Sequence, residues 1–202
     1  MVAQNSDMTK SSMNSVSIRS LSDGHSFSAK QIAAMAEELG MVLIPSAKSI
    51  AVPCEYADAS SAVGMLRDCA MSPAPNERVI VTPDADGVAV AMAVSNDVAE
   101  QLNGRIAVSP LQVGGNFDRG VSLWLSRGVA FVRVYDNGLR LAEAVEVATM
   151  ADLRYVLELL DATYNIYSTR ARVTADSEPW IGSFVELSKM MNQLFKDVVC
   201  EL

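Results

Sequence analysis

The stretch Val129–Leu160, VAFVRVYDNGLRLAEAVEVATMADLRYVLELL, contains the pattern that decides the fold class. Its first part is mostly apolar, with Val132 and Val134 on either side of Arg133, which predicts a β-strand over residues 129–135. The tripeptide Asp136-Asn137-Gly138 follows and is typical of a tight hairpin turn, because Asn and Gly tolerate positive φ. We therefore expect a second, antiparallel strand over residues 139–148.

A helix is expected directly after this hairpin. Thr149 and Asp152 form a capping box of the T-x-x-D type, and apolar residues then recur at helical spacing through Tyr164. On the amino-terminal side of the hairpin, the pattern of residues 121–125 predicts one further strand, which a turn at Ser126-Arg127-Gly128 joins to the next. The sequence therefore predicts three consecutive antiparallel strands followed by a helix.

Strands and helices alternate over the remaining residues. A short strand is expected over 172–174, a helix over the apolar stripe from Phe184 to Phe195, and a last strand over 198–202. The complete order is βββαβαβ. Each strand–helix–strand unit requires a right-handed crossover onto a parallel part of the sheet. The sequence therefore predicts an α/β fold with a mixed sheet and flanking helices.

The first half of the chain shows shorter patterns that predict a smaller unit of mixed type. The expected elements are a hairpin around Asp23-Gly24, a helix that begins at Ser28 and ends before Gly40, strands over 41–44 and 49–52, a helix over 58–71, a hairpin of 78–82 with 88–94, a helix capped by Ser95 that ends at Leu102, and a strand over 106–108. The loop Gln112–Gly120 marks the boundary with the second half. We expect a disordered segment over 1–15, a first subdomain over 16–112 and a second over 121–202.

Composition and charge exclude several classes of protein. The 16 Lys and Arg against 24 Asp and Glu give a net charge of −8, which opposes binding to nucleic acid. The polar first fifteen residues do not resemble a signal peptide, and no apolar run is long enough to insert in a membrane. The three cysteines form an odd, sparse set, typical of buried or neutral thiols in a reducing cytoplasm. A cytoplasmic protein without a metal centre is expected.

The βββαβαβ order resembles the ribonuclease-H-like fold, which occurs twice in the superfamily of actin, sugar kinases and heat-shock-chaperone ATPases. The hairpin VSIRSLSDGHSFSA at residues 16–29, combined with the stretch 129–160, looks like an uncharacterised bacterial family of domains of unknown function with an actin-like ATPase fold. The resemblance implies two ribonuclease-H-like subdomains in a reduced actin-like arrangement, of which the first is degenerate.

The chain departs from the motifs of active members of that superfamily. These have an Asp-x-Gly phosphate loop between the first two strands of each half, and a glycine pair near the adenosine. In the first half the turn carries Asp23-Gly24 without the intervening residue, and in the second half Leu125–Gly128 contains no carboxylate. The expected adenosine loop, Val173–Trp180, has no glycine pair. The resemblance therefore implies that the ATP site is lost, and no cofactor is expected.

Three hypotheses on function remain. The first is a non-catalytic actin-like-fold protein that acts through protein–protein contacts or assembly, with an unknown partner or as a homodimer. The second is a divergent ATP-binding protein or ATPase, whose phosphate-side residues would be Asp23, Gly24, Gly114 and Gly115. The third is a small-molecule sensor that uses the cleft between the subdomains.

The two tryptophans receive different predictions. Trp124 lies within the strand over 121–125 and is expected in the core. Trp180 lies in a loop beside Pro179, and we expect it to be exposed and to bind a protein partner.

Overall fold

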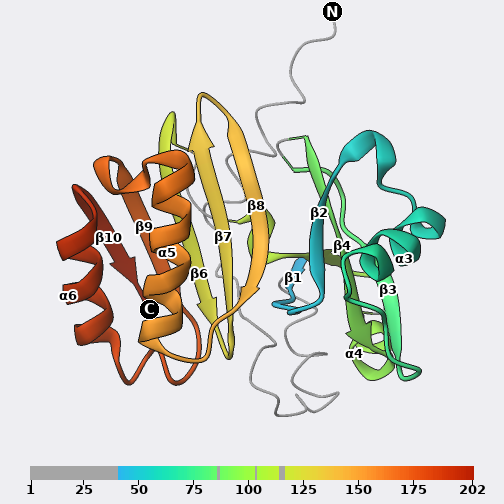
Figure 1. Ribbon diagram of the computed structural model, residues 1–202. Coiled ribbons are helices and arrows are strands. Elements are labelled where there is room, and N and C mark those ends of the chain that lie inside the picture. The colour runs from blue at the N-terminus through green and yellow to red at the C-terminus, as the bar shows by residue number, and fades with distance from the viewer. Residues whose placement is uncertain (1–40, 86, 103, 114–116) are drawn as a thin grey trace, which may run out of the picture.

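The computed structural model describes residues 41–85, 87–102, 104–113 and 117–202 (Figure 1). The expected disordered segment, the hairpin at Asp23-Gly24 and the helix from Ser28 lie outside these residues. The strands and helices of the described part are β1 (Met41–Leu43), β2 (Ser49–Pro53), α3 (Ala59–Asp68), β3 (Glu77–Val81), β4 (Val88–Ser95), α4 (Asn96–Leu102), β5 (Ile106–Val108), β6 (Arg119–Ser126), β7 (Val129–Asp136), β8 (Leu139–Glu146), α5 (Met150–Tyr164), β9 (Arg170–Ala175), α6 (Phe184–Leu194) and β10 (Asp197–Glu201). Three single 3₁₀ turns, over 54–56, 110–112 and 166–168, complete the order.

The second half has the predicted βββαβαβ order. Its strands lie in the order β10-β9-β6-β7-β8. The pairs β6–β7 and β7–β8 are antiparallel, whereas β9 runs parallel to β6 and β10 runs parallel to β9. The hairpin turn holds Asn137 at φ +52° and Gly138 at φ +123°, as residues of these types permit. This topology confirms the predicted mixed sheet.

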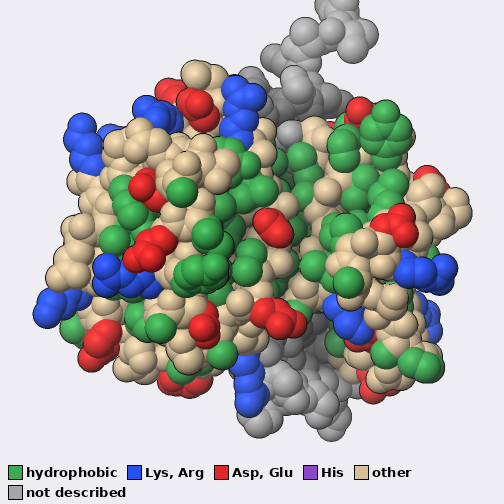
Figure 2. All heavy atoms as spheres, viewed as in Figure 1, with side chains coloured by type: hydrophobic (Ala, Val, Ile, Leu, Met, Phe, Trp, Pro, Cys, Tyr) green, Lys and Arg blue, Asp and Glu red, His purple; other side chains and the backbone are tan. Residues whose placement is uncertain are grey.

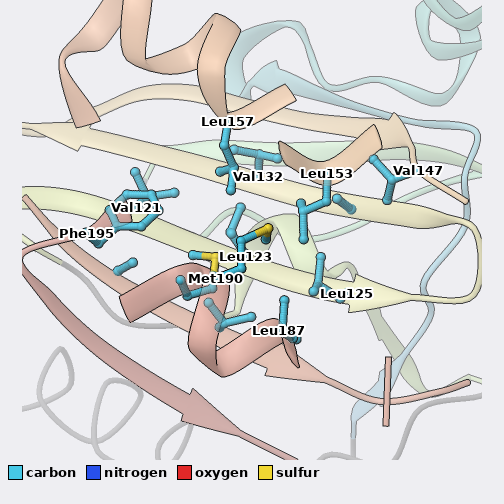
Figure 3. Packing of buried hydrophobic residues seen from close by; sticks show 14 of the residues in the cluster. Val121, Leu123, Leu125, Val132, Val147, Leu153, Leu157, Leu187, Met190 and Phe195 are labelled. Carbon is cyan, nitrogen blue, oxygen red and sulfur yellow. The ribbon is translucent and has the colours of Figure 1, made fainter. Parts of the chain in front are cut away.

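Both helices of the second half cover one face of this sheet (Figure 1). Alternate residues of β6, among them Leu123 and Leu125, point toward the helices, and Leu157 of α5 and Leu187 of α6 pack onto them (Figure 3). All four of these side chains are almost fully buried. The alternation of the strands and the stripes of the helices therefore produce one apolar layer, as the sequence patterns predict.

The capping box of α5 is present as predicted. The Thr149 hydroxyl accepts a hydrogen bond from the backbone N–H of Asp152 at 3.2 Å, and the Asp152 carboxylate accepts one from the backbone N–H of Thr149 at 2.9 Å. The helix ends where Asn165 adopts the left-handed conformation, at φ +50°. The capping box and this left-handed residue fix the length of α5 at four turns.

The first half has a different architecture in its described part. The strands β3, β4 and β2 form an antiparallel group, and β1 pairs with β5 as a separate parallel pair. The antiparallel group, with α3, lies in the sequence between β1 and β5. The described residues of this half therefore show an order of elements unlike that of the second half. The predicted subdomain boundaries, 16–112 and 121–202, remain predictions.

The helix α3 ends earlier than the sequence predicts. We expected a helix over 58–71, but Ala70 adopts a left-handed conformation at φ +60°. The backbone N–H of Met71 then donates to the Leu66 carbonyl at 2.8 Å, which is the six-to-one bond of a Schellman ending. No glycine marks this ending in the sequence. The prediction therefore relied on the apolar residues alone and made the helix too long.

The two halves share a sheet and an apolar core. The strand β2 pairs with β8 through the single register pair Ile50 and Glu143, which gives an eight-stranded sheet. On the face of β7 opposite the helices, Phe131 packs into a second cluster with Met92 of β4 and Leu111 near the junction. Contacts of this kind make the two halves one packed body.

Candidate functional site

The site at which the resemblance places a nucleotide lies at the carboxyl ends of β6 and β9. These strands are parallel neighbours, so the turn Ser126–Gly128 after β6 and the loop after β9 lie at the same end of the sheet. The backbone N–H of Asp176 donates to the Leu125 carbonyl at 3.1 Å, which ties the loop to the turn. Ligands of open α/β sheets bind at this end of the strands.

The indole of Trp180 fills the space beside this turn. Trp180 is 1% exposed, and its Nε1 donates to the Ser126 carbonyl at 2.9 Å. It belongs to the same apolar cluster as Leu125 and Leu187. The predicted exposure of Trp180 is wrong. The loop after β9 folds back over the end of β6, and the only polar atom of the indole side chain satisfies a buried carbonyl there. Trp180 is therefore a core residue, and it is not the exposed side chain that we expected to bind a partner.

Trp124 forms the second indole contact at this end of the sheet. Its Nε1 donates to Asp176 Oδ2 at 2.7 Å, while its ring packs at the edge of the cluster that joins the two halves. The prediction of a core position is met in part, since the side chain is half-buried. The Asp176 carboxylate thereby holds β6 against the loop after β9.

The residues of this end do not fit Mg-ATP. The turn offers the backbone of Arg127 and Gly128 but no carboxylate, and the nearby Asp176 carboxylate accepts a hydrogen bond from an indole. Within the described part of the chain, no group of three or more His, Cys, Asp or Glu side chains has the arrangement of a metal site. The residues of the ATP hypothesis in the first half, Asp23 and Gly24, and Gly114 and Gly115 of the junction, lie outside the described residues.

The opposite end of the same strands carries a cavity that sequence reasoning missed. Its volume is about 540 Å³, and the amino ends of β6, β9 and β10 surround it. The lining residues are Phe117, Asp118, Arg119, Ser168, Thr169, Arg170, Lys196 and Asp197. They come from three segments far apart in the sequence. The parallel pairing of the three strands brings these segments together, so no local motif marks the site.

Shifted pKa values in the described chain belong to structural groups. Hydrogen bonds from Ser60 and Ser61 hold the pKa of the Asp58 carboxyl far below its usual range, and Asp58 caps α3. The Thr149 hydroxyl lowers the pKa of Asp152 in the same manner. Burial raises the pKa of the half-buried Cys200 thiol, which is therefore neutral at pH 7. Cys54 and Cys69 are free and exposed, so burial, one of the two alternatives expected for the cysteines, does not apply to them.

Comparison with solved structures shows which fold this topology belongs to. A Bacteroides thetaiotaomicron protein with an actin-like ATPase fold and unknown function matches with a TM-score of 0.59 at 13% identity. The match covers 86% of this chain and 76% of that chain. The chain has the actin-like ATPase fold. At this identity the likeness shows the fold alone, and the activity of the Bacteroides protein is itself unknown.

A second match is weaker. The cytoplasmic domain of EpsL, an inner membrane component of the type II secretion system of Vibrio cholerae, gives a TM-score of 0.35 at 13% identity. The match covers 73% of this chain and 66% of that chain, a likeness too low to bear on the fold. No family model matches the chain, and neither does any curated protein. No helix of the described residues has the length and apolar character needed to cross a membrane.

Proposed function

We propose that this protein is a non-catalytic member of the actin-like fold class that acts through protein–protein contacts or assembly. The observation that carries the proposal is the position of Trp180. Its buried indole occupies the side of the Ser126–Gly128 turn and binds the Ser126 carbonyl, at the end of the sheet where the fold class holds phosphate. On this proposal, a nucleotide phosphate on the Ser126 side of the turn would compete with a core side chain.

The energetic cost of that displacement supports the proposal. Removing a large aromatic side chain from a core costs about 3–5 kcal/mol, and an unpaired buried carbonyl adds about 1–3 kcal/mol. A ligand would have to offset this cost before any net binding appeared. This cost supports an end of β6 that is built around a core tryptophan.

Further parts of the proposal concern family and surroundings. We infer that the chain belongs to the bacterial family of unknown function that it resembles, and that it works in the cytoplasm. The net charge of −8 supports a protein that does not bind nucleic acid, because phosphate backbones would be repelled.

Thermal unfolding with and without about 5 mM Mg-ATP, supported by calorimetry, tests the proposal. A ligand at a hundred times its dissociation constant adds about 2.7 kcal/mol of stability, which raises the melting temperature by several degrees. We expect no shift and no binding heat in the variant Arg119→Gln/Lys196→Gln, which lacks two basic side chains of the cavity at the opposite end of the sheet. A shift that persists in Arg119→Gln/Lys196→Gln would revive the ATP hypothesis and make Asp23→Ala the first variant to examine.

The assembly part of the proposal needs its own measurement. Sedimentation velocity over a hundredfold range of protein concentration, followed by sedimentation in extract from the source cells, reports self-association and stable partners. A larger species in either experiment supports the proposal. A monomer in both, together with ATP binding, would contradict it.

A further inference from the structure

We propose that the cavity at the amino ends of β6, β9 and β10 binds a small polyvalent phosphate or pyrophosphate anion. This site lies at the opposite end of the strands from the Trp180 turn, so the inference is independent of the proposed function. Its volume, about 540 Å³, falls within the usual range of about 300–1,000 Å³ for small-molecule sites.

The charge of the lining favours an anion. Three cations, Arg119, Arg170 and Lys196, face two carboxylates, Asp118 and Asp197, so the cavity carries a net charge of +1. The whole chain carries −8. Figure 2 shows Lys and Arg side chains gathered along the upper left edge of the molecule, over the amino ends of these strands. A concave site with an excess of one charge sign raises the local concentration of ligands of the opposite sign.

Two of the three cations have no partner in the described residues. Arg170 Nε lies 2.9 Å from Asp197 Oδ2, and this ion pair uses one carboxylate of the lining. The side chains of Arg119 and Lys196 form no ion pair or hydrogen bond with any described residue. A bound anion would give both cations a partner, and Arg offers paired N–H donors that match phosphate oxygens.

The walls of the cavity are fixed in place without a ligand. The ring of Tyr167 meets that of Phe195 edge-on, with centroids 5.3 Å apart, which joins the loop before β9 to the loop that carries Lys196. The backbone N–H of Tyr167 also donates to Asp161 Oδ1 at 2.8 Å. On the remaining side, Phe117 packs edge-on against Tyr135 with centroids 6.0 Å apart. A preorganised site loses little entropy when it binds.

Gly120 allows the close packing of β6 and β9 at this end. A Cβ atom at Gly120 would lie 2.9 Å from the Arg170 carbonyl and 2.9 Å from the Phe117 ring. Both neighbours belong to the lining, so any larger residue would push β6 away from β9. The glycine therefore holds Arg119 and Arg170 on adjacent strands at the mouth of the same cavity.

Calorimetric titration with inorganic pyrophosphate, without Mg²⁺, tests the site. We expect saturable binding that weakens as salt rises. The double variant Arg119→Gln/Lys196→Gln should bind at least about tenfold more weakly, since charge-assisted hydrogen bonds are lost. Asp118→Asn removes a carboxylate from the lining and should tighten binding. Arg67→Gln/Lys189→Gln, which neutralises an exposed Arg and an exposed Lys outside this cavity, is the matched control and should bind as the wild type does.

Two results would overturn the inference. One is the absence of saturable binding by the wild type up to about 10 mM pyrophosphate, well above typical ligand affinities. The other is equal binding by the Arg119→Gln/Lys196→Gln variant and its control, which would mean adsorption to charge in general. Both double variants should keep the melting temperature of the wild type, because all four side chains are exposed.

Discussion

At the residue scale, Trp180 combines two stabilising contributions at the end of β6. It buries a large aromatic surface, and it satisfies the Ser126 carbonyl. We predict that Trp180→Ala lowers the free energy of unfolding by about 3–5 kcal/mol, and that Trp180→Phe, which keeps much of the packing, lowers it by about 1–3 kcal/mol. Urea unfolding followed by circular dichroism measures both values.

Tyr155 provides the control for this series. It lies on α5 with 62% of its surface exposed, so Tyr155→Ala should change the unfolding free energy by no more than about 0.5 kcal/mol. If Trp180→Ala were as mild as Tyr155→Ala, Trp180 would not close the turn in solution.

Glu77 should make the free energy of unfolding depend on pH. The backbone N–H of Ala74 and the ammonium of Lys48, 2.6 Å away, hold the pKa of the Glu77 carboxyl below its ordinary value of 4.5. A lowered folded pKa stabilises the protein above the unfolded pKa, and this stability is lost as the pH falls through the folded pKa. We therefore predict that the unfolding free energy declines below pH 4.5 and that Glu77→Gln makes the decline shallower. Urea unfolding at a series of pH values measures this. Identical slopes for the two proteins would contradict it.

At the element scale, the amino end of α5 depends on its capping box. Thr149→Ala removes the acceptor for the Asp152 backbone N–H and also the hydroxyl that donates to the Asp152 carboxylate at 2.8 Å. We predict a loss of about 1 kcal/mol. Thr163→Ala, at the other end of the same helix, is the matched control and should cost less than about 0.5 kcal/mol. Thermal unfolding ranks the two variants, and equal melting temperatures would refute the role of the cap.

Elements with strong local signals could be predicted from the sequence, and those without them could not. The hairpin at Asn137-Gly138 and the box at Thr149 are defined by neighbouring residues, so the βββα part of the second half was predicted closely. The end of α3 was missed because Ala70, a good helix former, takes the left-handed conformation.

The candidate sites were harder to predict because they depend on tertiary contacts. A tryptophan beside a proline in a loop has the local signature of an exposed residue, yet the loop after β9 returns Trp180 to the core. Arg119, Arg170 and Lys196 come from three segments far apart in the sequence. They line one cavity only because β6, β9 and β10 pair in parallel in this register.

At the scale of the whole molecule, the sheet separates the two candidate sites. Two hydrogen-bonded indoles lie at the carboxyl ends of β6 and β9, the closed end of our proposal, whereas the amino ends of β6, β9 and β10 open into a cavity with basic side chains. The two ends are joined by the six-residue register of β6 with β9. An anion that binds the protein should therefore leave the closed end undisturbed.

The chain contains two tryptophans, and both indole N–H groups lie at the closed end of the sheet. A proton–nitrogen correlation spectrum recorded during titration with Mg-ATP therefore reports directly on the turn after β6. The account predicts two indole signals that do not move, of which that of Trp180 exchanges slowly with solvent because it is buried and hydrogen-bonded. A saturable shift or loss of the Trp180 signal as Mg-ATP is added would contradict it.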